Sequence, residues 1–355
     1  MLQTAYFLGA NSPAGFSSLY DELSDPNRMK ALYILKGGPG CGKSTLMKRV
    51  ARHAEAAGLD IQRILCSGDP ESLDAVFFPQ TGIAVADGTA PHVMEACCPG
   101  AVETYIDLSR FYDRSALQSV KQELLACSTE YKEHYRNAYR TLGAAGELRR
   151  SLSEAAESAE LRQKLQKRAK GIIGRELKES SGGSGQAERR FLGAVTHRGA
   201  VQLWDTVSAQ ASRVYELEDT HGLAHHLLSP ILQAALAAGC RAVACFDPMD
   251  PDRLAHLILP EHSLAFVTSP AEMPWPHHPY RRLRLDAMAE ETLRRAGKPR
   301  LRFTRKITDA LLEDSIASLS AAKAAHDRLE ALYNPHVDFD GVLSLADQLA
   351  TRILT

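Results

Sequence analysis

The sequence predicts an α/β fold of two related lobes, each a parallel sheet followed by a helical segment. The chain has 355 residues, which is room for two domains of ordinary size. Short apolar runs alternate with stretches of helical periodicity, as in parallel sheets covered by helices. One series of short patterns also occurs twice along the chain. We therefore expect a first lobe at residues 1–180, a linker at residues 181–188 and a second lobe at residues 189–355.

The internal repeat is the main sign of how the chain is organised. The pattern FLGA occurs at Phe7–Ala10 and again at Phe191–Ala194. The pattern D-P-x-x-L-x-x-x-x-x-P follows at Asp69–Pro79 and at Asp250–Pro260. These and other matches keep one order over about 80 residues, which favours duplication over chance similarity between two α/β segments.

The first copy predicts strands and a helix in alternation. Leu32–Leu35 is an apolar run without alternation, which is typical of a buried parallel strand. Ser44–Ala57 has helical periodicity, and Gly58 is placed to end that helix. Further strands are expected at Ile61–Cys66 and Ile83–Ala86, joined by a short connection. Together they indicate a parallel sheet covered on both faces.

Residues 110–180 indicate two long amphipathic helices, because apolar residues recur there at three- and four-residue steps. We expect a hairpin with its turn near GAAGE, residues 143–147. The segment ESSGGSGQ, residues 179–186, has the composition of a flexible linker. The second copy also ends in helices, one of which contains Ile307, Leu311, Ile316 and Leu319.

The clearest functional signal lies between the first strand and the first helix. The residues Gly37-x-x-x-x-Gly42-Lys43-Ser44 fit the Walker A pattern. Glycines let backbone N–H groups approach phosphate oxygens, and the N-terminus of the helix adds positive potential. Lys43 can bridge the β- and γ-phosphates, and the Ser44 hydroxyl can bind Mg²⁺. The alternative is a glycine-rich loop that binds nothing. The expected phosphate-binding residues are Gly37, Gly38, Pro39, Gly40, Cys41, Gly42, Lys43, Ser44 and Thr45.

Asp87 is the candidate Walker B carboxylate. It ends the apolar run of GIAVADGT, and the carboxyl edge of a parallel sheet is where such an Asp holds the metal. A turn residue in the dipeptide Asp-Gly is the alternative. Ser44 and Asp87 are therefore the expected Mg²⁺ ligands. No Glu follows Asp87, so the Asp-Glu pair of many fast ATPases is missing there.

Two further residues are weaker catalytic candidates. Asp74 and His92 follow the second and third strands, near the same edge of the sheet, and neither recurs in the second copy. Asp74 could contact substrate, and His92 could position water or the γ-phosphate. An ordinary loop histidine remains the alternative for His92. Asp69 recurs as Asp250, which favours a structural turn at both positions.

The second copy keeps the framing residues of the loop but not its phosphate-binding residues. Aligned on its glycine, Gly222, it places Glu218 and Asp219 where a phosphate chain would lie. Their carboxylates would repel a triphosphate. This lobe is therefore expected to be a degenerate partner of the first. The alignment sets Gly42 against Ala224, Lys43 against His225 and Ser44 against His226.

Composition narrows the range of partners. The net charge is −1 with His neutral, which gives no overall attraction to nucleic acid or to an acidic membrane. The basic stretches RRLRLD and RAGKPRLRFTRK leave a nucleic-acid contact, or an Arg directed at the γ-phosphate, as alternatives to a solvated surface. Seven cysteines without a C-x-x-C pair favour reduced thiols and a cytoplasmic location. No membrane span or signal peptide is expected.

The chain resembles the P-loop NTPase superfamily on residues Gly37–Thr45 and, more weakly, on Asp87. The spacing KGGPGCGKSTLM, CSGDPESLDAV, AVADGTAPH is also similar to a group of bacterial P-loop proteins labelled as ATPases or nucleotide-binding proteins. That similarity spans nearly the whole chain. It implies a P-loop α/β fold and ATP binding, with phosphate roles for Gly37, Gly42, Lys43 and Ser44.

These observations predict an enzyme that binds Mg-ATP and hydrolyses it slowly, coupled to a rearrangement of the lobes or of a partner. ATP is preferred over GTP because the sequence has no N-K-x-D loop. The helical segments are suited to contact with a protein partner. Two alternatives stay open. One is a small-molecule or nucleotide kinase, and the other is a nucleotide-gated binding module with negligible turnover.

Overall fold

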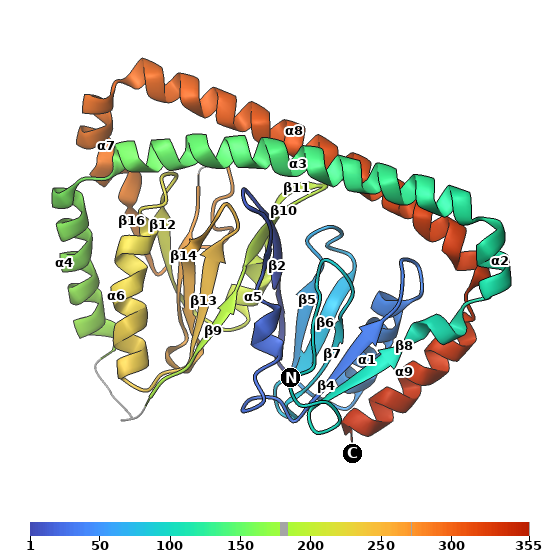
Figure 1. Cartoon of the computed structure of the whole chain (residues 1–355). Coiled ribbons are helices and arrows are strands. Elements are labelled where there is room, and N and C mark those ends of the chain that lie inside the picture. The colour runs from blue at the N-terminus through green and yellow to red at the C-terminus, as the bar shows by residue number, and fades with distance from the viewer. Residues whose placement is uncertain (178–183, 271, 355) are drawn as a thin grey trace.

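The computed structural model of the protein describes residues 1–177, 184–270 and 272–354. Among these residues, two six-stranded sheets form the centre of the molecule, with helices around them (Figure 1). Most of the predicted linker, residues 178–183, lies outside the described residues. Residues 184–186 lead directly into the first strand of the second lobe.

The first sheet has the strand order β1-β5-β6-β7-β4-β8. Strand β6 is antiparallel to both of its neighbours, whereas the other three pairs are parallel. The prediction of a short connection at this place was therefore wrong. A strand fits there because an antiparallel strand needs only a tight turn at each end. The strands are β1 Gln3–Tyr6, β4 Ala31–Lys36, β5 Ile61–Leu65, β6 Leu73–Phe78, β7 Ile83–Asp87 and β8 Glu103–Asp107.

The second sheet repeats this arrangement strand for strand, in the order β9-β13-β14-β15-β12-β16. Its pairs are parallel and antiparallel at the same places as in the first sheet. The prediction of two similar α/β lobes is therefore confirmed. The strands are β9 Ala187–Arg190, β12 Arg213–Glu218, β13 Ala242–Asp247, β14 Asp250–Leu259, β15 Leu264–Thr268 and β16 Arg281–Arg284.

The helices repeat as well. Each lobe has one helix after its loop, one helix of 36 residues and one shorter terminal helix. Of the helices that the structure describes, none is long and apolar enough to cross a membrane. The main helices are α1 Lys43–Ala56, α3 Lys121–Ala156, α4 Ala159–Glu176, α6 Ala224–Ala237, α8 Lys298–Tyr333 and α9 Phe339–Leu354.

The smaller elements complete both copies. In each lobe a two-stranded hairpin follows the first strand and leads into a short helical segment. The hairpins are β2 Gly9–Ser12 with β3 Gly15–Ser18, and β10 Gly193–Thr196 with β11 Gly199–Gln202. The short helices are η1 Tyr20–Leu23, η2 Leu108–Phe111, α2 Arg114–Ser119, α5 Trp204–Ser208, η3 Pro260–His262, α7 Leu285–Ala296 and η4 Asn334–His336.

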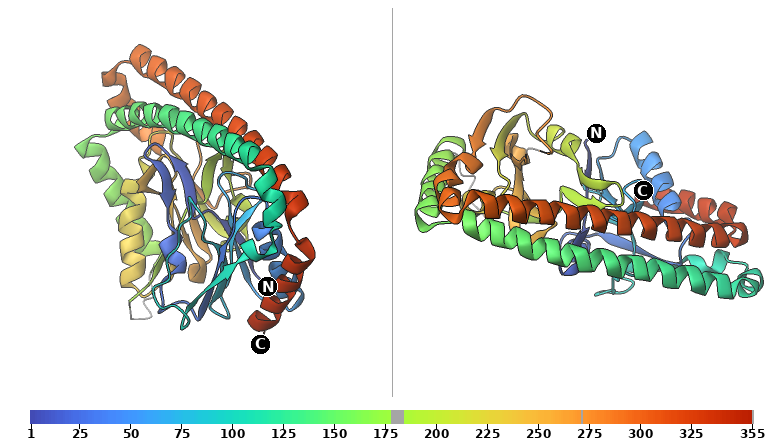
Figure 2. Two further views of the ribbon diagram at one scale, coloured as in Figure 1. Left: turned by 45° about the vertical axis from the view of Figure 1, so that its right-hand side comes forward. Right: turned by 90° about the horizontal axis from the view of Figure 1, so that it is seen from above.

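The predicted turn at GAAGE, residues 143–147, was wrong, because α3 continues through it without a break. Its glycines allow close packing instead of a turn. A Cβ added at Gly146 would lie 2.4 Å from Cγ of Pro13 at the tip of the β2–β3 hairpin. The antiparallel partner of α3 is α8, which comes from the other half of the chain, and the two long helices cross both lobes side by side (Figures 1 and 2).

The terminal helices are exchanged between the lobes. Helix α4 belongs to the first half of the chain but packs against α6 on the outer face of the second sheet. Helix α9 belongs to the second half but packs against α1 on the outer face of the first sheet. Arg49 on α1 donates to Asp347 on α9 at 2.6 Å. The division at residues 181–188 therefore follows the repeat in the sequence, while the helical layers cross it.

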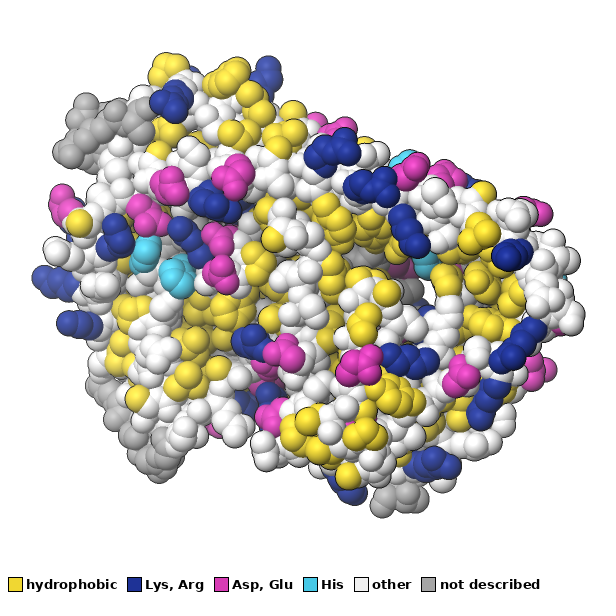
Figure 3. Space-filling view, in the orientation of Figure 1, with side chains coloured by type: hydrophobic (Ala, Val, Ile, Leu, Met, Phe, Trp, Pro, Cys, Tyr) yellow, Lys and Arg dark blue, Asp and Glu magenta, His cyan; other side chains and the backbone are white. Residues whose placement is uncertain are grey.

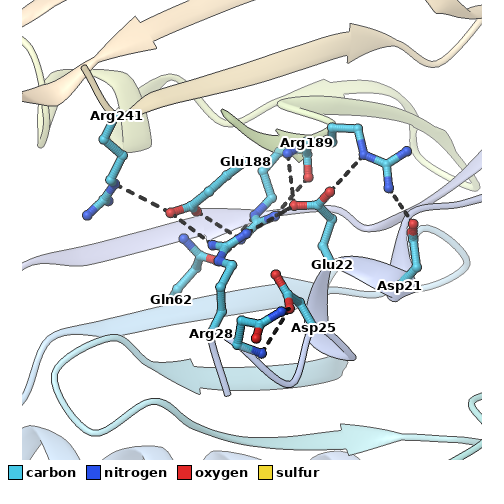
Figure 4. Close-up of polar contacts among 10 residues, drawn as sticks. Asp21, Glu22, Asp25, Arg28, Gln62, Glu188, Arg189 and Arg241 are labelled. Atoms are coloured by element: carbon cyan, nitrogen blue, oxygen red, sulfur yellow. Dashed lines mark hydrogen bonds and ion pairs between the residues drawn. The ribbon is translucent and has the colours of Figure 1, made fainter. Parts of the chain in front are cut away.

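The inner faces of the two sheets contribute to one shared core. At its edge, Phe7 and Phe191 exchange two backbone hydrogen bonds of 2.9 Å. Nearby, Arg190 is only 1% exposed and donates to Gln62 and Glu188, and Arg28 also pairs with Glu188 (Figure 4). A buried charge remains stable only when it is paired in this way. The lobes are thus joined by apolar packing and by a buried ion network.

Candidate functional site

The glycine-rich loop joins β4 to α1, in the strand–loop–helix context that the Walker A pattern requires. Gly40 and Gly42 adopt the left-handed conformation, with φ of 67° and 83°. Gly42 directly precedes α1, and no side chain caps the helix there. The first N–H groups of α1 are therefore available to an anion.

Three predicted site residues meet at this loop. Lys43 donates from Nζ to the carbonyl oxygens of Gly37 and Gly38, at 2.8 and 2.9 Å. The same Nζ lies 3.5 Å from Oδ2 of Asp87. Ser44 accepts a hydrogen bond of 2.9 Å from the backbone of Leu73. The lysine, the hydroxyl and the carboxylate of the predicted Mg-nucleotide site are thus brought to the start of α1.

The two carboxylate oxygens of Asp87 have different neighbours, and its predicted role as a metal ligand stays a prediction. It ends β7, which pairs directly with β4 in the sheet. Its Oδ1 accepts from the backbone and hydroxyl of Thr89, at 2.8 and 2.6 Å, which is a turn interaction. Its Oδ2 faces Lys43. One oxygen therefore stabilises the turn, and the other lies beside the loop.

Asp74 and His92 form a buried pair beside this loop. His92 Nε2 lies 3.3 Å from Asp74 Oδ2, and Tyr20 donates to the same oxygen at 2.6 Å. Burial raises the pKa of the Asp74 carboxyl, although His92 and Tyr20 oppose the rise. His92 is 6% exposed, and its Nδ1 has no hydrogen-bond partner.

Two members of this group were missed by the sequence analysis. Cys66 lies close to Asp74 and His92, and its place just after a strand was the available signal. Tyr20 comes from η1, far from any motif, so no pattern pointed to it.

The end of α8 covers the loop of the first lobe. With its amide nitrogen turned toward them, Asn334 donates to the carbonyl oxygens of Gly40 and Glu330, at 3.0 and 3.2 Å. Farther along α8, Lys323 lies 3.6 Å from Oδ2 of Asp69. A Cβ added at Gly42 would contact Val342 of α9 at 3.3 Å. Figure 3 shows this face of the molecule, with a hollow between the first lobe and the long helices.

The corresponding loop of the second lobe is one residue shorter, so the alignment made from the sequence needs a correction. Helix α6 begins at Ala224 as α1 begins at Lys43. The backbone of Leu254 donates to His225 Nδ1 at 3.2 Å, as Leu73 donates to Ser44. Ala224 therefore occupies the lysine position, and His225, not His226, occupies the serine position.

A carboxylate of the chain itself occupies this second loop. Asp219 accepts from the backbone N–H groups of His221 and Ala224, at 3.0 and 2.6 Å. The side chain is 3% exposed, and burial raises its pKa, although the backbone donors oppose that rise. Thr220 donates from its backbone and hydroxyl to Asp286. Backbone N–H groups that would face an anion are thus already bound to carboxylates.

The end of α3 covers this second loop, just as α8 covers the first. Glu157, the residue after α3, lies 3.2 Å from His226 and 3.0 Å from Arg253. Arg253 also donates to the carbonyl oxygen of Gly222 at 3.4 Å. Each long helix therefore ends on the loop of the lobe formed by the other half of the chain.

A cavity of about 280 Å³ lies apart from both loops. It is lined by residues of β8, η2 and α9, including Tyr105, Arg110 and Gln348. No residue of the Walker A pattern lines it. The chemistry that the sequence indicated is thus found at the first loop and not in this cavity.

Comparisons of the chain with protein-family models, with curated proteins and with solved structures find no match. The function must therefore be argued from the residues and their geometry.

Proposed function

We propose that the protein is a P-loop NTPase that binds Mg-ATP at the first lobe and hydrolyses it slowly. The observation that carries this proposal is the convergence of Lys43, Ser44 and Asp87 at the N-terminus of α1. They come from the loop, the helix and the adjacent strand, and each has the chemistry that a Mg-nucleotide needs.

Binding would exchange the present contacts of Lys43 for contacts with phosphate. Lys43 now donates to two neutral carbonyl oxygens of its own loop and lies 3.5 Å from a carboxylate oxygen of Asp87. Phosphate oxygens are charged acceptors, and charge-assisted hydrogen bonds are about twice as strong as neutral ones. A phosphate chain would also provide partners for the free N–H groups at the start of α1. Ser44 and Asp87 would hold Mg²⁺ or its water shell.

Slow turnover fits the residues around Asp87. The next two residues are Gly88 and Thr89, so the strand supplies no Glu to activate water. Asp74 and His92 stay predicted catalytic residues. The pair lies beside the loop, where it could position water or an acceptor hydroxyl.

The contact between α8 and the loop supports coupling to a larger rearrangement. Asn334 bonds to Gly40 in the middle of the Walker A pattern, and Tyr333 lies beside Gly38. A triphosphate that wraps this loop would alter both contacts. Helix α8 spans 36 residues, about 54 Å, and can carry the movement of its end to the second lobe.

The second lobe is proposed to be degenerate and to bind no nucleotide. Asp219 already accepts the N–H groups of its loop, and the lysine position holds Ala224. A triphosphate would have to displace a buried carboxylate without a lysine to compensate for its charge. This lobe then acts as the partner against which the first lobe works.

Phosphate release from labelled Mg-ATP by the purified chain tests the proposal. We expect slow release that is lost in Lys43→Ala and retained in Lys48→Ala, an exposed lysine on the same helix. Transfer of the label to a metabolite would identify a kinase instead. If ATP binds but no phosphate is released, even with cell extract added, the protein is a nucleotide-gated binding module and the hydrolase proposal is wrong.

A further inference from the structure

Cys66, Asp74 and His92 bring three potential metal ligands together. They follow or belong to β5, β6 and β7, and one ligand atom from each lies within 4.8 Å of the others. The contact between Asp74 and His92 is already 3.3 Å. Zinc bound tetrahedrally at about 2.0–2.3 Å places its ligand atoms roughly 3.3–3.8 Å apart. Small side-chain movements would therefore complete such a geometry.

The charge of the group matches a divalent ion. A Cys thiolate and an Asp carboxylate together carry two negative charges, which a divalent cation neutralises. Asp74 and His92 are buried and Cys66 is half-buried, so the two charged ligands are largely shielded from water. A bound cation would offset the cost of burying them. It would also be bound by the imidazole of His92, through Nε2, the ring nitrogen that faces Asp74.

Neighbouring residues hold the group in place. Tyr20 donates to Asp74 Oδ2, which is the kind of outer contact that orients a ligating carboxylate. The ring of His92 lies between Phe16 and Tyr20, with ring centroids 5.1 and 4.8 Å away. The imidazole is thus fixed by packing, as the ligands of a preorganised site are.

The second lobe shows that the fold does not require these residues. Leu73 corresponds to Leu254, so Asp74 corresponds to Ala255. The repeat pattern likewise sets Cys66 against Asp247, which pairs with Arg149 at 2.7 Å. The same strands therefore form without Cys66 and Asp74 at the matching positions. Among the residues that the structure describes, this group of ligands occurs in the lobe with the Walker A pattern and not in the other.

We propose that Cys66, Asp74 and His92 bind a divalent transition-metal ion, and that Zn²⁺ fits the set best. A thiolate ligand selects zinc and similar ions, whereas Mg²⁺ prefers oxygen ligands. The site is separate from the Mg²⁺ site proposed at Ser44 and Asp87, and in this proposal Asp74 and His92 hold the metal ion instead of positioning water or an acceptor. It does not depend on nucleotide binding, so the two proposals can fail independently.

Titration of the metal-free full chain with Co²⁺ tests the site, because cobalt replaces zinc and absorbs light through a Co–thiolate bond. We expect one Co²⁺ per chain with a sulfur-to-cobalt absorption band, displaced by Zn²⁺. Cys66→Ser should lose the band, whereas Cys97→Ser, which changes an exposed cysteine, should keep it. A wild-type chain without the band, or a band retained in Cys66→Ser, would overturn the proposal.

Further variants distinguish the loss of a metal ligand from a defect in folding. Tyr20→Phe keeps all three ligands and should weaken Co²⁺ binding about ten- to a hundredfold. The group His326, Asp327 and Glu330 on α8 has no thiol, so binding there would give no sulfur band. Unchanged affinity in Tyr20→Phe would contradict the assigned site. Calorimetry with ATP on the same sample tests the nucleotide site separately.

Discussion

The loop between β4 and α1 and the loop between β12 and α6 are surrounded by the same strands and helices. They differ in the charge of their side chains. In the first, Lys43 contacts two loop carbonyl oxygens and Asp87, and no side chain caps the start of α1. In the second, Asp219 lies in the loop and accepts its N–H groups. The strands and helices around both loops are the same. The comparison shows that the strands and helices do not depend on a few loop side chains, to which we attribute the proposed phosphate binding of the first loop.

The largest expected effect tests whether only the first loop binds nucleotide. Calorimetry should find one ATP per chain, and Lys43→Ala should weaken binding about ten- to a hundredfold, since a charge-assisted contact contributes about 1.5–3 kcal/mol. ATP at about 100 times its Kd should stabilise the chain by about 2.7 kcal/mol, or about 3–4 °C if the joined lobes unfold together. Two sites per chain would refute the comparison.

The next prediction concerns the pH dependence of stability, to which a buried histidine of the second lobe should contribute. His256 on β14 is buried, and desolvation lowers its pKa to about 4, whereas the equivalent position on β6 is Ala75. The folded state thus binds this proton less readily than the unfolded state. The contribution of neutral His256 to the free energy of unfolding is therefore fully present above pH 6.5, the ordinary pKa of the residue. This contribution is lost as the pH falls toward 4.

When the pH is lowered from 7 to 4.5, the presence of His256 should lower the free energy of unfolding by about 2–3 kcal/mol. Urea titration at the two pH values measures this change. His256→Asn retains an acceptor for the Thr268 backbone and should reduce the pH dependence by that amount. An equal pH dependence in the variant would show that other groups cause it.

A third test removes the carboxylate from the second loop. Asp219→Ala leaves two buried N–H groups without partners and should lower the free energy of unfolding by about 1–3 kcal/mol. ATP binding at the first lobe should not change. Glu218→Ala, at the adjacent position, is the control and should cost less, since its partner Arg282 is exposed. If the Asp219 variant gains a second ATP site, that carboxylate alone blocks the loop.

The smallest effect concerns the helix ends on the two loops. Asn334→Ala removes a bond to Gly40 that ATP would have to displace, so it should tighten ATP binding about two- to tenfold. Glu157→Ala makes the matching change at the second loop and should leave ATP affinity unaltered. Weaker binding in Asn334→Ala would mean that this contact supports the bound state instead of opposing it.

The sequence predicted the parts of the fold that local pattern controls. The strand before the loop, the helix after it and the duplication follow from runs of residues that are close in the chain. The long helices were recognised, but their partners were not. An apolar stripe shows that a helix must be covered, and it does not show by which half of the chain. The predicted turn at GAAGE was wrong for a related reason, because glycine allows close packing between segments as well as turns.

The candidate site was predicted in the same uneven way. Lys43 and Ser44 were predicted from the Walker A spacing, and Asp87 was predicted from its place at the end of an apolar run. Asn334 and Tyr20 were missed, since they reach the site from distant segments through tertiary contacts. The shift from His226 to His225 came from a single deleted residue, which only the shared hydrogen bond to the following strand made visible.

The exchange of helices has a consequence for how the protein is made. Helix α9 completes the outer layer of the first lobe and follows its loop by about 300 residues. During synthesis, the first lobe leaves the ribosome long before this helix exists, and until then α1 lacks its neighbour on the outer face of the sheet. The second lobe has no such delay, because α4 precedes it in the chain. A nascent chain therefore completes the helical layer beside the first loop only after the second lobe has been made.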